Sequence, residues 1–506
     1  MKKIFQKKWG HAMRQIKQLL SNIEYDVLQG SVEGEITELV YDSRKAVEGC
    51  MFLCMKGSSF DGHQFAAPVA DVGARIIIVE QEVDVRSDVT VVMVEDTRAA
   101  LAEISAAYFD YPVDRLKVIG ITGTKGKTTT TYMVKSILEN AGYQVGLIGT
   151  IESIIGNERI PSANTTPESY TIQEYFAKMV EKGVDICVME VSSQGLMMHR
   201  VDGFEFEIGI FTNIEPDHIG PNEHSSFEDY LHCKALLFQK CRFGIFNADD
   251  EHLDEILEDH TCKVLTYGFS KKADYCVEHM QLVHGKGYLG VSYDVTGLVN
   301  GPIEIDVPGR FSVYNSLCSI AICNHFQVSL ENMQKALKIA KVKGRIELIK
   351  VSEEFTLMID YAHNAMALES LLETLKEYEP GRLVCLFGCG GNRSKLRRYE
   401  MGEVAGRLAD LTIITSDNPR FEEPADIIAD IRTGIEKTDG AFIEIIDRKE
   451  AIHYAIAHAK PRDVIVLAGK GHEDYQEIKG KKYPMDERVL IHEVVEELGS
   501  ALLGAK

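Results

Sequence analysis

The chain has 506 residues, of which 45% are hydrophobic and 26% charged, a composition typical of a globular protein with several buried cores. At about 150 residues per domain, this length predicts roughly three domains. The 55 Lys and Arg against 77 Asp and Glu give a formal net charge of −22. Long-range repulsion therefore argues against nucleic acid or an acidic membrane surface as a partner, and small anionic substrates would need locally concentrated positive charge.

The cysteines and the N-terminus bear on the cellular compartment. Eleven cysteines without a C-x-x-C pair do not form a disulfide scaffold or a zinc ribbon, so we expect buried thiols in a reducing environment. The basic N-terminus lacks the continuous apolar stretch of a signal peptide, and no apolar run reaches the ~18 residues that span a bilayer. We therefore expect a cytoplasmic protein. Apolar residues at helical spacing predict an N-terminal amphipathic helix: Ile4, Met13, Ile16, Leu19 and Leu20.

Three segments with different patterns follow one another, which predicts domains over 1–112, 113–342 and 343–506. The second and third contain apolar strands that alternate with helices, a pattern typical of parallel α/β sheets covered on both faces. We therefore predict an α/β fold with a central parallel-sheet domain and a Rossmann-like C-terminal domain. The predicted strands lie at 74–80, 89–95, 116–123, 184–193, 206–214, 382–391, 411–420 and 463–473.

A glycine-rich phosphate loop lies between the strand at 116–123 and the following helix. It is a shortened relative of the G-x-x-x-x-G-K-[ST] motif, in which backbone N–H groups and a helix N-terminus hold polyphosphate. In that interpretation Lys127 neutralises the terminal phosphates and Thr128 offers its hydroxyl to Mg²⁺. The alternative is a simple turn that caps the helix. Such a turn does not explain why the glycines, the lysine and the threonine all stand at the positions of the motif directly after a strand. The loop comprises Gly123, Thr124, Lys125, Gly126, Lys127, Thr128 and Thr129.

Two residues at the ends of neighbouring strands are candidate metal ligands. Glu190 ends the strand at 184–193, where a carboxylate suits a hard cation. His218 follows the strand at 206–214. Either residue alone is as well explained by an ordinary structural role, but together they make a shared metal site a reasonable hypothesis.

Collinear short motifs extend this interpretation to the whole chain. Their order and spacing resemble those of the Mur ligases, ATP-dependent enzymes that form amide bonds in peptidoglycan synthesis. The motifs are GTKGKTT (123–129), NTTPES (164–169), EVSS (190–193), TNI-x-x-DH (212–218), Y-x-x-x-K (230–234), NADD (247–250), GRIE (344–347) and DYAH (360–363).

The resemblance implies a mechanism and a set of reacting groups. A substrate carboxylate attacks the γ-phosphate of ATP, and an amine then attacks the resulting acyl phosphate. Lys127, Glu190, His218 and Lys234 match the family's catalytic positions, and Thr128, Glu190, His218 and Lys234 match its Mg²⁺ site. In the family the lysine at this position is carbamylated, which turns a cation into an anionic ligand; an unmodified surface lysine is the alternative.

The resemblance also assigns substrate contacts. Asn315, Arg345 and Asp360 match positions that hold the nucleotide, in addition to the phosphate loop. The N-terminal Asp-Ser-Arg segment around Ser43 resembles the UDP-sugar-binding part of the MurE-type branch, whose members extend UDP-N-acetylmuramoyl-L-alanyl-D-glutamate by one residue. Further positions that match muramoyl contacts are Asn164, Thr165, Thr166, Ser192 and Arg200.

The residues expected to select the amino acid that is added lie in the third segment. Its DNPR sequence resembles the variant that selects meso-diaminopimelate, whose distal carboxylate suits arginine and whose ammonium suits a carboxylate. Arg393 and Arg420 can supply the first and Glu473 the second, whereas lysine has no distal carboxylate. Surface arginines in loops are the alternative. The candidate positions are Arg393, Asp417, Asn418, Pro419, Arg420, Gly469 and Glu473.

Some positions depart from the family pattern. Gln194 replaces a histidine, Met198 stands where a glutamine often contacts substrate, and Ser312 replaces an asparagine. These departures leave open a paralogue that uses lysine, another amino acid or another carboxylate acceptor, and a non-catalytic scaffold. A generic phosphate-loop kinase does not explain the C-terminal Arg and Glu loops. We expect only small-molecule partners and a monomer.

Overall fold

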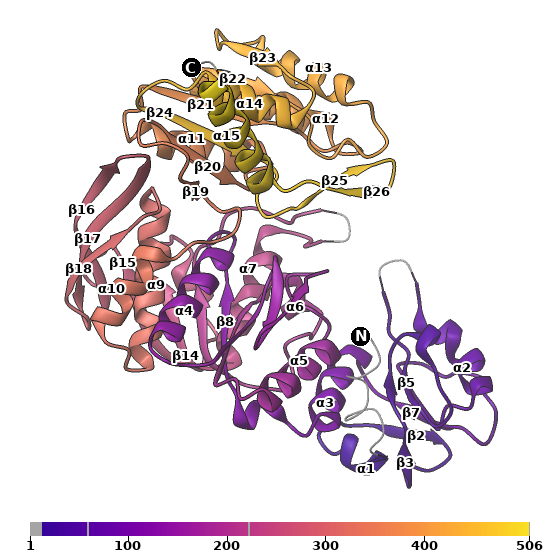
Figure 1. Ribbon diagram of the computed structural model, residues 1–506. Helices are drawn as coiled ribbons and strands as arrows, with labels where there is room; N and C mark the ends of the chain where they lie inside the picture. The colour runs from indigo at the N-terminus through magenta and orange to yellow at the C-terminus, as the bar shows by residue number, and fades with distance from the viewer. Residues whose placement is uncertain (1–12, 58–59, 221–222, 505–506) are drawn as a thin grey trace. The chain divides into compact units, whose positions relative to one another are not determined.

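The computed structural model describes residues 13–57, 60–220 and 223–504, with the side chains described as far as residue 499 (Figure 1). The chain divides into two compact units, Met1–Tyr267 and Gly268–Lys506. Most of the predicted N-terminal helix lies outside the described residues. The rest of that prediction is largely wrong, because Met13 is 60% exposed, Arg14–Gln15 form strand β1 and helix α1 spans only Ile16–Leu19.

The first part of unit 1 is a five-stranded sheet in the order β2-β7-β6-β5-β4. Its strands are parallel except for β2, which runs antiparallel to β7. All four side chains of β6 are buried, and they alternate between two apolar clusters on opposite faces of the sheet. The elements are β2 (Asp26–Gln29), β3 (Glu35–Ile36), β4 (Leu39–Val40), β5 (Met51–Leu53), α2 (Ala66–Val72), β6 (Ile76–Val79), β7 (Thr90–Met93) and α3 (Thr97–Tyr108).

The second part of unit 1 is a larger sheet with the strand order β11-β10-β9-β12-β8-β13-β14-β15. Strands β9, β12, β8, β13, β14 and β15 are parallel, as the continuous apolar runs predicted, and the edge strands β10 and β11 are antiparallel. The strands are β8 (Lys117–Thr122), β9 (Val145–Ile148), β10 (Glu152–Ile155), β11 (Glu158–Pro161), β12 (Ile186–Glu190), β13 (Phe206–Phe211), β14 (Cys241–Asn247) and β15 (Lys263–Gly268).

The helices of this second part connect the parallel strands (Figure 1). The apolar faces of all but the first of them join a buried cluster that includes Phe176, Leu196 and Tyr230. The helices are α4 (Lys127–Asn140), α5 (Ser169–Glu181), α6 (Ser193–Met197), α7 (Phe227–Ala235) and α8 (Leu253–Ile256).

Unit 2 begins with an antiparallel meander in the order β16-β17-β18, followed by two helices. The elements are β16 (Tyr275–Gly285), β17 (Tyr288–Gly297), β18 (Gly301–Ile305), α9 (Arg310–His325) and α10 (Leu330–Ile339).

The rest of unit 2 is a six-stranded sheet in the order β19-β20-β24-β21-β22-β23. All its strands are parallel except the edge strand β19, and helices accompany them. The elements are β19 (Glu347–Ile349), β20 (Thr356–Asp360), α11 (Ala365–Lys376), β21 (Arg382–Phe387), α12 (Lys395–Leu408), β22 (Leu411–Ile414), α13 (Pro424–Ile435), β23 (Phe442–Glu444), α14 (Arg448–Ala457), β24 (Asp463–Ala468), β25 (Tyr475–Ile478), β26 (Lys481–Pro484) and α15 (Glu487–Gly504).

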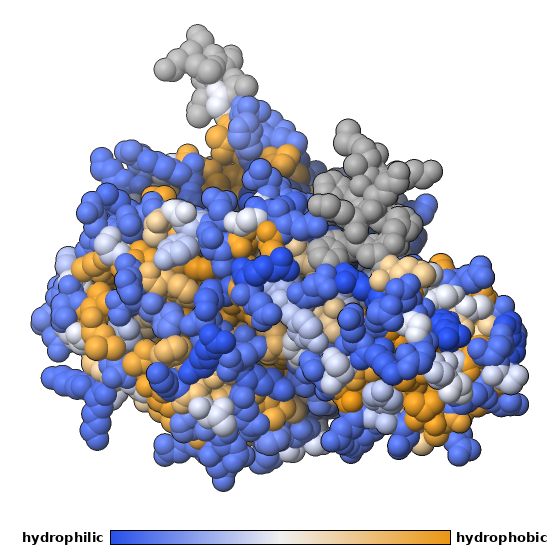
Figure 2. Space-filling view, turned by 90° about the horizontal axis from the view of Figure 1, so that it is seen from below, coloured by the Kyte–Doolittle hydropathy of each residue, from blue (hydrophilic) through white to orange (hydrophobic). Residues whose placement is uncertain are grey.

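Other whole-chain expectations can be compared with the structure. All eleven cysteines are free and buried, as predicted. Within the described part of the chain, no helix combines the length and the apolarity needed to cross a bilayer. Figure 2 shows hydrophilic residues spread over the visible face, with hydrophobic residues scattered between them. The proposed boundaries after residues 112 and 342 stay predictions.

Candidate functional site

The phosphate loop connects strand β8 to helix α4, as the motif predicted. Gly123 and Gly126 have φ angles of 139° and 87°, which favour glycine. A Cβ atom on Gly123 would lie 1.9 Å from Thr212 Oγ1, so this position has no room for a side chain. Lys127 is the first residue of α4, and its Nζ donates to the carbonyl oxygens of Gly123 at 2.8 Å and Thr124 at 3.1 Å.

The end of strand β13 holds this loop in place. The backbone N–H of Thr124 donates to Asn213 O at 2.8 Å, and that of Lys125 donates to Asn213 Oδ1 at 2.9 Å. Thr212 Oγ1 donates to Lys125 O at 2.7 Å. Thr212 and Asn213 belong to the TNI-x-x-DH motif, in which neither was predicted to have a role, and the structure shows that they fix the backbone of the loop.

Glu190 ends strand β12 beside the loop, with 1% of its surface exposed. Its Oε2 accepts hydrogen bonds from the hydroxyls of Thr128 and Thr150, both at 2.9 Å, and its Oε1 accepts one from the N–H of Thr150 at 2.9 Å. Thr150 was not predicted; its only signal was its place just after β9, the neighbour of β12 in the sheet. A buried carboxylate and two hydroxyls are oxygen ligands of the kind that Mg²⁺ prefers.

Lys234 reaches the same loop from helix α7. It is 2% exposed, so the alternative of a surface lysine is wrong. Its Nζ donates to Gly123 O at 2.9 Å and lies 4.4 Å from the centre of the Tyr230 ring. Burial, and then the charge of Lys127, hold the pKa of Lys234 well below its usual value, which favours the neutral amine.

His218 is placed differently from the other candidate ligands. Its side chain is 54% exposed, and Nδ1 lies 3.2 Å from Glu223 Oε1. Among the described residues, no hydrogen bond or ion pair joins it to Thr128, Glu190 or Lys234. His218 follows β13 by seven residues in an irregular segment, so the strand end does not fix its direction. The shared metal site therefore stays a prediction.

Most of the predicted muramoyl contacts gather around the end of β12. Thr165 Oγ1 lies 3.0 Å from Thr150 Oγ1, and Thr166 Oγ1 donates to Glu190 O at 3.1 Å. Ser192 N donates to Thr166 Oγ1 at 2.9 Å, and the Arg200 guanidinium donates to Thr166 O at 3.0 Å. Two predicted residues lie outside this cluster: Asn164, which is exposed, and Ser43, which begins a short helical turn.

In unit 2, two of the predicted nucleotide residues lie together. Asp360 ends strand β20 and accepts hydrogen bonds from the N–H groups of Ile346 and Ala362, both at 2.8 Å. Burial raises the pKa of Asp360, although the nearby Arg345 opposes this. The Arg345 guanidinium lies 4.6 Å from the centre of the Tyr361 ring. Asn315 lies on α9, and its backbone carbonyl accepts from Ser319 Oγ.

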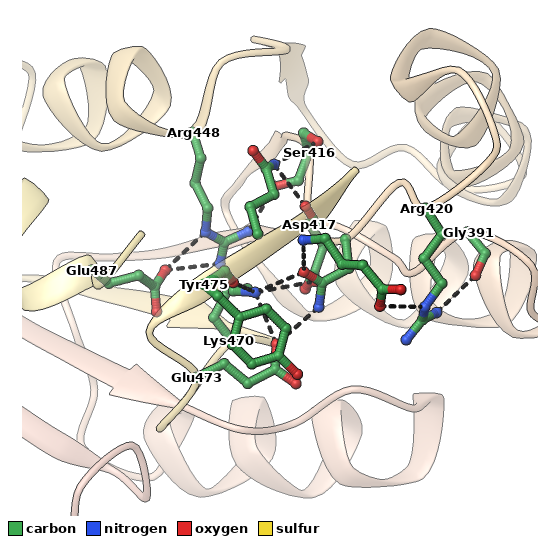
Figure 3. Close-up of polar contacts among 12 residues, drawn as sticks. Gly391, Ser416, Asp417, Arg420, Arg448, Lys470, Glu473, Tyr475 and Glu487 are labelled. Atoms are coloured by element: carbon green, nitrogen blue, oxygen red, sulfur yellow. Dashed lines mark hydrogen bonds and ion pairs between the residues drawn. The ribbon is translucent and has the colours of Figure 1, made fainter. Parts of the chain in front are cut away.

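The three loops predicted to bind the amino acid follow β21, β22 and β24, which are neighbours in the sheet. A fully buried lysine, Lys470, joins two of them (Figure 3). Its Nζ donates to Asn418 Oδ1 at 3.0 Å and to Glu473 Oε2 at 2.8 Å, and Asn418 Nδ2 donates to the same Glu473 oxygen at 2.8 Å. Burial alone would raise the pKa of Glu473, but Lys470 and Asn418 outweigh it and lower that pKa.

Arg448 connects the strand ends from which the same loops start (Figure 3). Its guanidinium donates to Ser416 O at 3.1 Å and to Ala468 O at 3.0 Å, the residues just before Asp417 and Gly469. Its Nε donates to Glu487 Oε1 at 2.9 Å, and both side chains are buried. Lys470 lies within the predicted strand range 463–473 but was given no role there. Arg448 and Glu487 gave no local signal because their contacts are far apart in the chain.

The two predicted arginines differ in their surroundings. Arg420 Nε donates to Glu477 Oε2 at 3.1 Å, and Arg420 Nη1 donates to Gly391 O at 2.7 Å, which links the second loop to the first (Figure 3). Arg393 is exposed, as expected from the alternative that these arginines are surface residues in loops. The arrangement thus places one oriented guanidinium, one exposed guanidinium and the carboxylate of Glu473 on adjacent loops.

Models of one protein family match most of the chain. The matches are the Mur ligase family catalytic domain at residues 35–109, the Mur ligase middle domain at 121–323 and the Mur ligase glutamate ligase domain at 344–471.

Curated relatives match it over nearly the whole length. UDP-N-acetylmuramoyl-L-alanyl-D-glutamate–2,6-diaminopimelate ligase 1 of Clostridium acetobutylicum is 42% identical over 488 residues, which cover 96% of this chain and 99% of that protein. The ligase of the same name, without the number, from Caldanaerobacter subterraneus subsp. tengcongensis is 42% identical over 95% of this chain and 98% of its own.

Solved structures of Mur ligases also match the chain. One titled as a UDP-N-acetylmuramoyl-L-alanyl-D-glutamate–2,6-diaminopimelate ligase has a TM-score of 0.71 at 27% identity and covers 96% of this chain and 100% of its own. The MurF ligase of Thermotoga maritima in complex with ADP shares the fold, with a TM-score of 0.59 at 18% identity over 91% of this chain and 97% of its own. With its three-domain α/β architecture and these matches along the chain, the protein belongs to the Mur ligase family.

Proposed function

We propose that this protein is an ATP-dependent ligase that adds meso-diaminopimelate to UDP-N-acetylmuramoyl-L-alanyl-D-glutamate in peptidoglycan synthesis. The observation that carries the proposal is the convergence of the phosphate loop, the buried Glu190 carboxylate and the buried Lys234 amine in unit 1. The relatives named for this reaction match the chain over nearly its whole length. Domains 1–112, 113–342 and 343–506 would bind the UDP-muramoyl group, ATP and the amino acid, respectively.

The reaction has two transfers. One of the two free glutamyl carboxylates of the muramoyl dipeptide attacks the γ-phosphorus of ATP, forming the acyl phosphate and releasing ADP. The neutral amine of the amino acid then attacks the acyl carbon, an amide bond forms, and inorganic phosphate leaves with loss of one proton from nitrogen. The first transfer brings two anions together and the second needs the amine held against the acyl carbon, so charge neutralisation and positioning are the main tasks of the protein.

The chain's own residues suit these tasks. The N–H groups of residues 123–129 and the N-terminus of α4 would hold the phosphates, with Lys127 Nζ neutralising charge. In unit 2, Asn315, Arg345 and Asp360 would contact the rest of the nucleotide. On the muramoyl side we assign Ser43, Asn164, Thr165, Thr166, Ser192 and Arg200.

Magnesium fits the oxygen ligands around Glu190. Thr128, Glu190, His218 and Lys234 as a carbamate are the proposed ligands, of which Thr128 and Glu190 already contact each other at 2.9 Å. Carbamate formation needs an unprotonated amine, and the lowered pKa of Lys234 favours that form. When bound, the ion neutralises charge that develops on the transferred phosphoryl group.

For the amino acid we assign the three loops of unit 2. Arg420 and Arg393 would bind the distal carboxylate of meso-diaminopimelate, and Glu473 would bind its ammonium. Glu473 Oε2 already accepts two hydrogen bonds, from Asn418 and Lys470, which fixes the orientation of the carboxylate. The remaining residues that we assign to the amino-acid site, around these side chains, are Asp417, Asn418, Pro419 and Gly469.

Phosphate release from ATP tests the proposal directly. We expect release that depends on Mg²⁺, the muramoyl dipeptide and meso-diaminopimelate together, and that falls at least about 100-fold in Lys127→Ala, as for loss of a reaction-site charge contact. Lys135→Ala, on the same helix but paired with Glu139, is the control and should keep activity. Stimulation by L-lysine instead would reject the amino-acid assignment, and no release with any amino acid would favour another acceptor or a scaffold.

A further inference from the structure

Three side chains with metal-binding atoms lie together just before Lys234, and the proposed reaction uses none of them. His224, Asp229 and Cys233 each offer one ligand atom, and these atoms all lie within 4.8 Å of one another. Asp229 and Cys233 are four residues apart on α7, so they share one face of the helix, and His224 precedes the helix.

The separations come close to those of ligands around one small ion, with the imidazole and the thiol each near a different oxygen of the same carboxylate. His224 Nδ1 lies 3.7 Å from Asp229 Oδ2, and Cys233 Sγ lies 3.6 Å from Asp229 Oδ1. In a tetrahedral zinc site with Zn–N and Zn–O near 2.1 Å and Zn–S near 2.3 Å, neighbouring ligand atoms are about 3.4–3.6 Å apart. Little movement is therefore needed to bring the three atoms onto one ion.

His224 supplies an independent observation. Its side chain is 0% exposed, and its Nδ1 has no hydrogen-bond partner. A buried polar atom without a partner is unfavourable, and this one faces the Asp229 carboxylate. The other ring nitrogen, Nε2, lies 2.8 Å from Ser193 Oγ, so a proton on Nε2 leaves the Nδ1 lone pair directed at the cluster.

The carboxylate is also held in place. Asp229 Oδ2 accepts hydrogen bonds from the N–H of Ser225 at 2.9 Å and from its hydroxyl at 3.1 Å. Two of the three ligands are thus oriented by neighbouring groups before an ion arrives, as in metal sites whose ligands are fixed by outer hydrogen bonds.

We propose that His224, Asp229 and Cys233 bind one Zn²⁺ ion, with a water molecule as the fourth ligand. Imidazole and thiolate ligands favour Zn²⁺ over Mg²⁺, which prefers six oxygen ligands. Binding forms a Zn–S bond and releases the Cys233 thiol proton to solvent, without oxidation or reduction. This site is distinct from the proposed Mg²⁺ site and does not depend on the ligase reaction.

Cobalt(II) serves as a spectroscopic probe for this site in the full-length protein. With metal removed, adding Co²⁺ is expected to give a thiolate-to-cobalt charge-transfer band in the near ultraviolet that saturates at one equivalent. Zn²⁺ should abolish the band, whereas excess Mg²⁺ should not. The band should be lost in Cys233→Ser and strongly weakened in Asp229→Asn, and the circular dichroism spectrum shows whether each variant is folded.

Cys262→Ser is the matched control. Cys262 is a buried thiol beside Cys241 elsewhere in unit 1, so it tests whether another thiol pair binds the ion. The control should keep the full cobalt band and one equivalent of zinc after gel filtration. A band that survives in folded Cys233→Ser, a band lost in Cys262→Ser, or no band in the unaltered protein would each overturn the proposal.

Discussion

At the scale of single residues, the phosphate loop depends on glycine at one backbone position. Gly123 combines a φ of 139° with a position where a Cβ would lie 1.9 Å from Thr212 Oγ1 and 2.9 Å from Asn213 O. The same close approach lets the end of β13 hold the loop backbone through Asn213. The two effects, backbone conformation and steric space, can be separated experimentally.

We expect Gly123→Ala to weaken ATP binding and to lower the free energy of unfolding by roughly 3 kcal/mol, from about 1 kcal/mol of backbone strain and about 2 kcal/mol of overpacking. Gly142→Ala is the control, because Gly142 also has a positive φ, of 99°, but nothing lies within 4 Å of an added Cβ. Urea unfolding and ATP titration measure both. Equal effects of the two substitutions would mean that the contact with Thr212 does not matter.

At the scale of elements, Arg448 at the start of α14 joins β22, β24 and α15. Its guanidinium donates to the last carbonyls before two amino-acid loops and pairs with the buried Glu487. Removing one partner of a buried ion pair costs about 3–5 kcal/mol, whereas replacing both with apolar residues is often neutral. This difference separates the stabilising role of Arg448 from its positioning role.

Arg448→Met should therefore lower the free energy of unfolding by about 3 kcal/mol, and adding Glu487→Met should restore only part of it, because two backbone carbonyls stay unpaired. The KM for diaminopimelate should rise about tenfold in Arg448→Met. It should stay raised in the double variant, because the carbonyls of Ser416 and Ala468 still lack their donor. The KM for ATP is the internal control, because none of the proposed ATP contacts is one of the amino-acid-binding residues assigned to these loops. Recovery of the diaminopimelate KM in the double variant would contradict a positioning role.

The segment before α13 contains a pH-sensitive contact. Arg398 of α12 is buried and donates to both oxygens of Glu422 at 2.8 Å, and the N–H of Asn392 donates to the same carboxylate. Arg398 lowers the pKa of Glu422 to about 2. A lowered pKa in the folded state gives stability that is complete above the unfolded value, near 4.3, and is lost as pH falls towards 2.

The comparison of the unaltered protein with Glu422→Gln by urea unfolding between pH 7 and pH 3 tests this contact. We expect the difference in unfolding free energy to be constant down to about pH 5 and then to shrink as the pH falls. Glu436→Gln, at an exposed i,i+4 pair with Arg432, should show almost no difference at any pH. A Glu422→Gln difference that does not change with pH would mean that the pKa of Glu422 is ordinary.

At the scale of the whole molecule, the sequence predicted those features that depend on local pattern. Continuous apolar runs predicted the parallel strands β8, β12, β13, β21, β22 and β24, and the glycine and lysine spacing predicted the phosphate loop. Thr150, Arg448 and Glu487 were missed because their contacts join residues 15 or more positions apart. The N-terminal helix was predicted too long, since Arg14–Gln15 pair with β3 instead of continuing a helix.

In the proposed reaction this Mur ligase activates a glutamyl carboxylate of the muramoyl dipeptide as an acyl phosphate and joins it to meso-diaminopimelate. We would test this first with dipeptide in which both free glutamyl carboxylates carry oxygen-18, and with mass spectrometry of both products. We expect one labelled oxygen in the released phosphate and a tripeptide that has gained one diaminopimelate residue. Unlabelled phosphate, or a product formed with L-lysine and not with diaminopimelate, would contradict it.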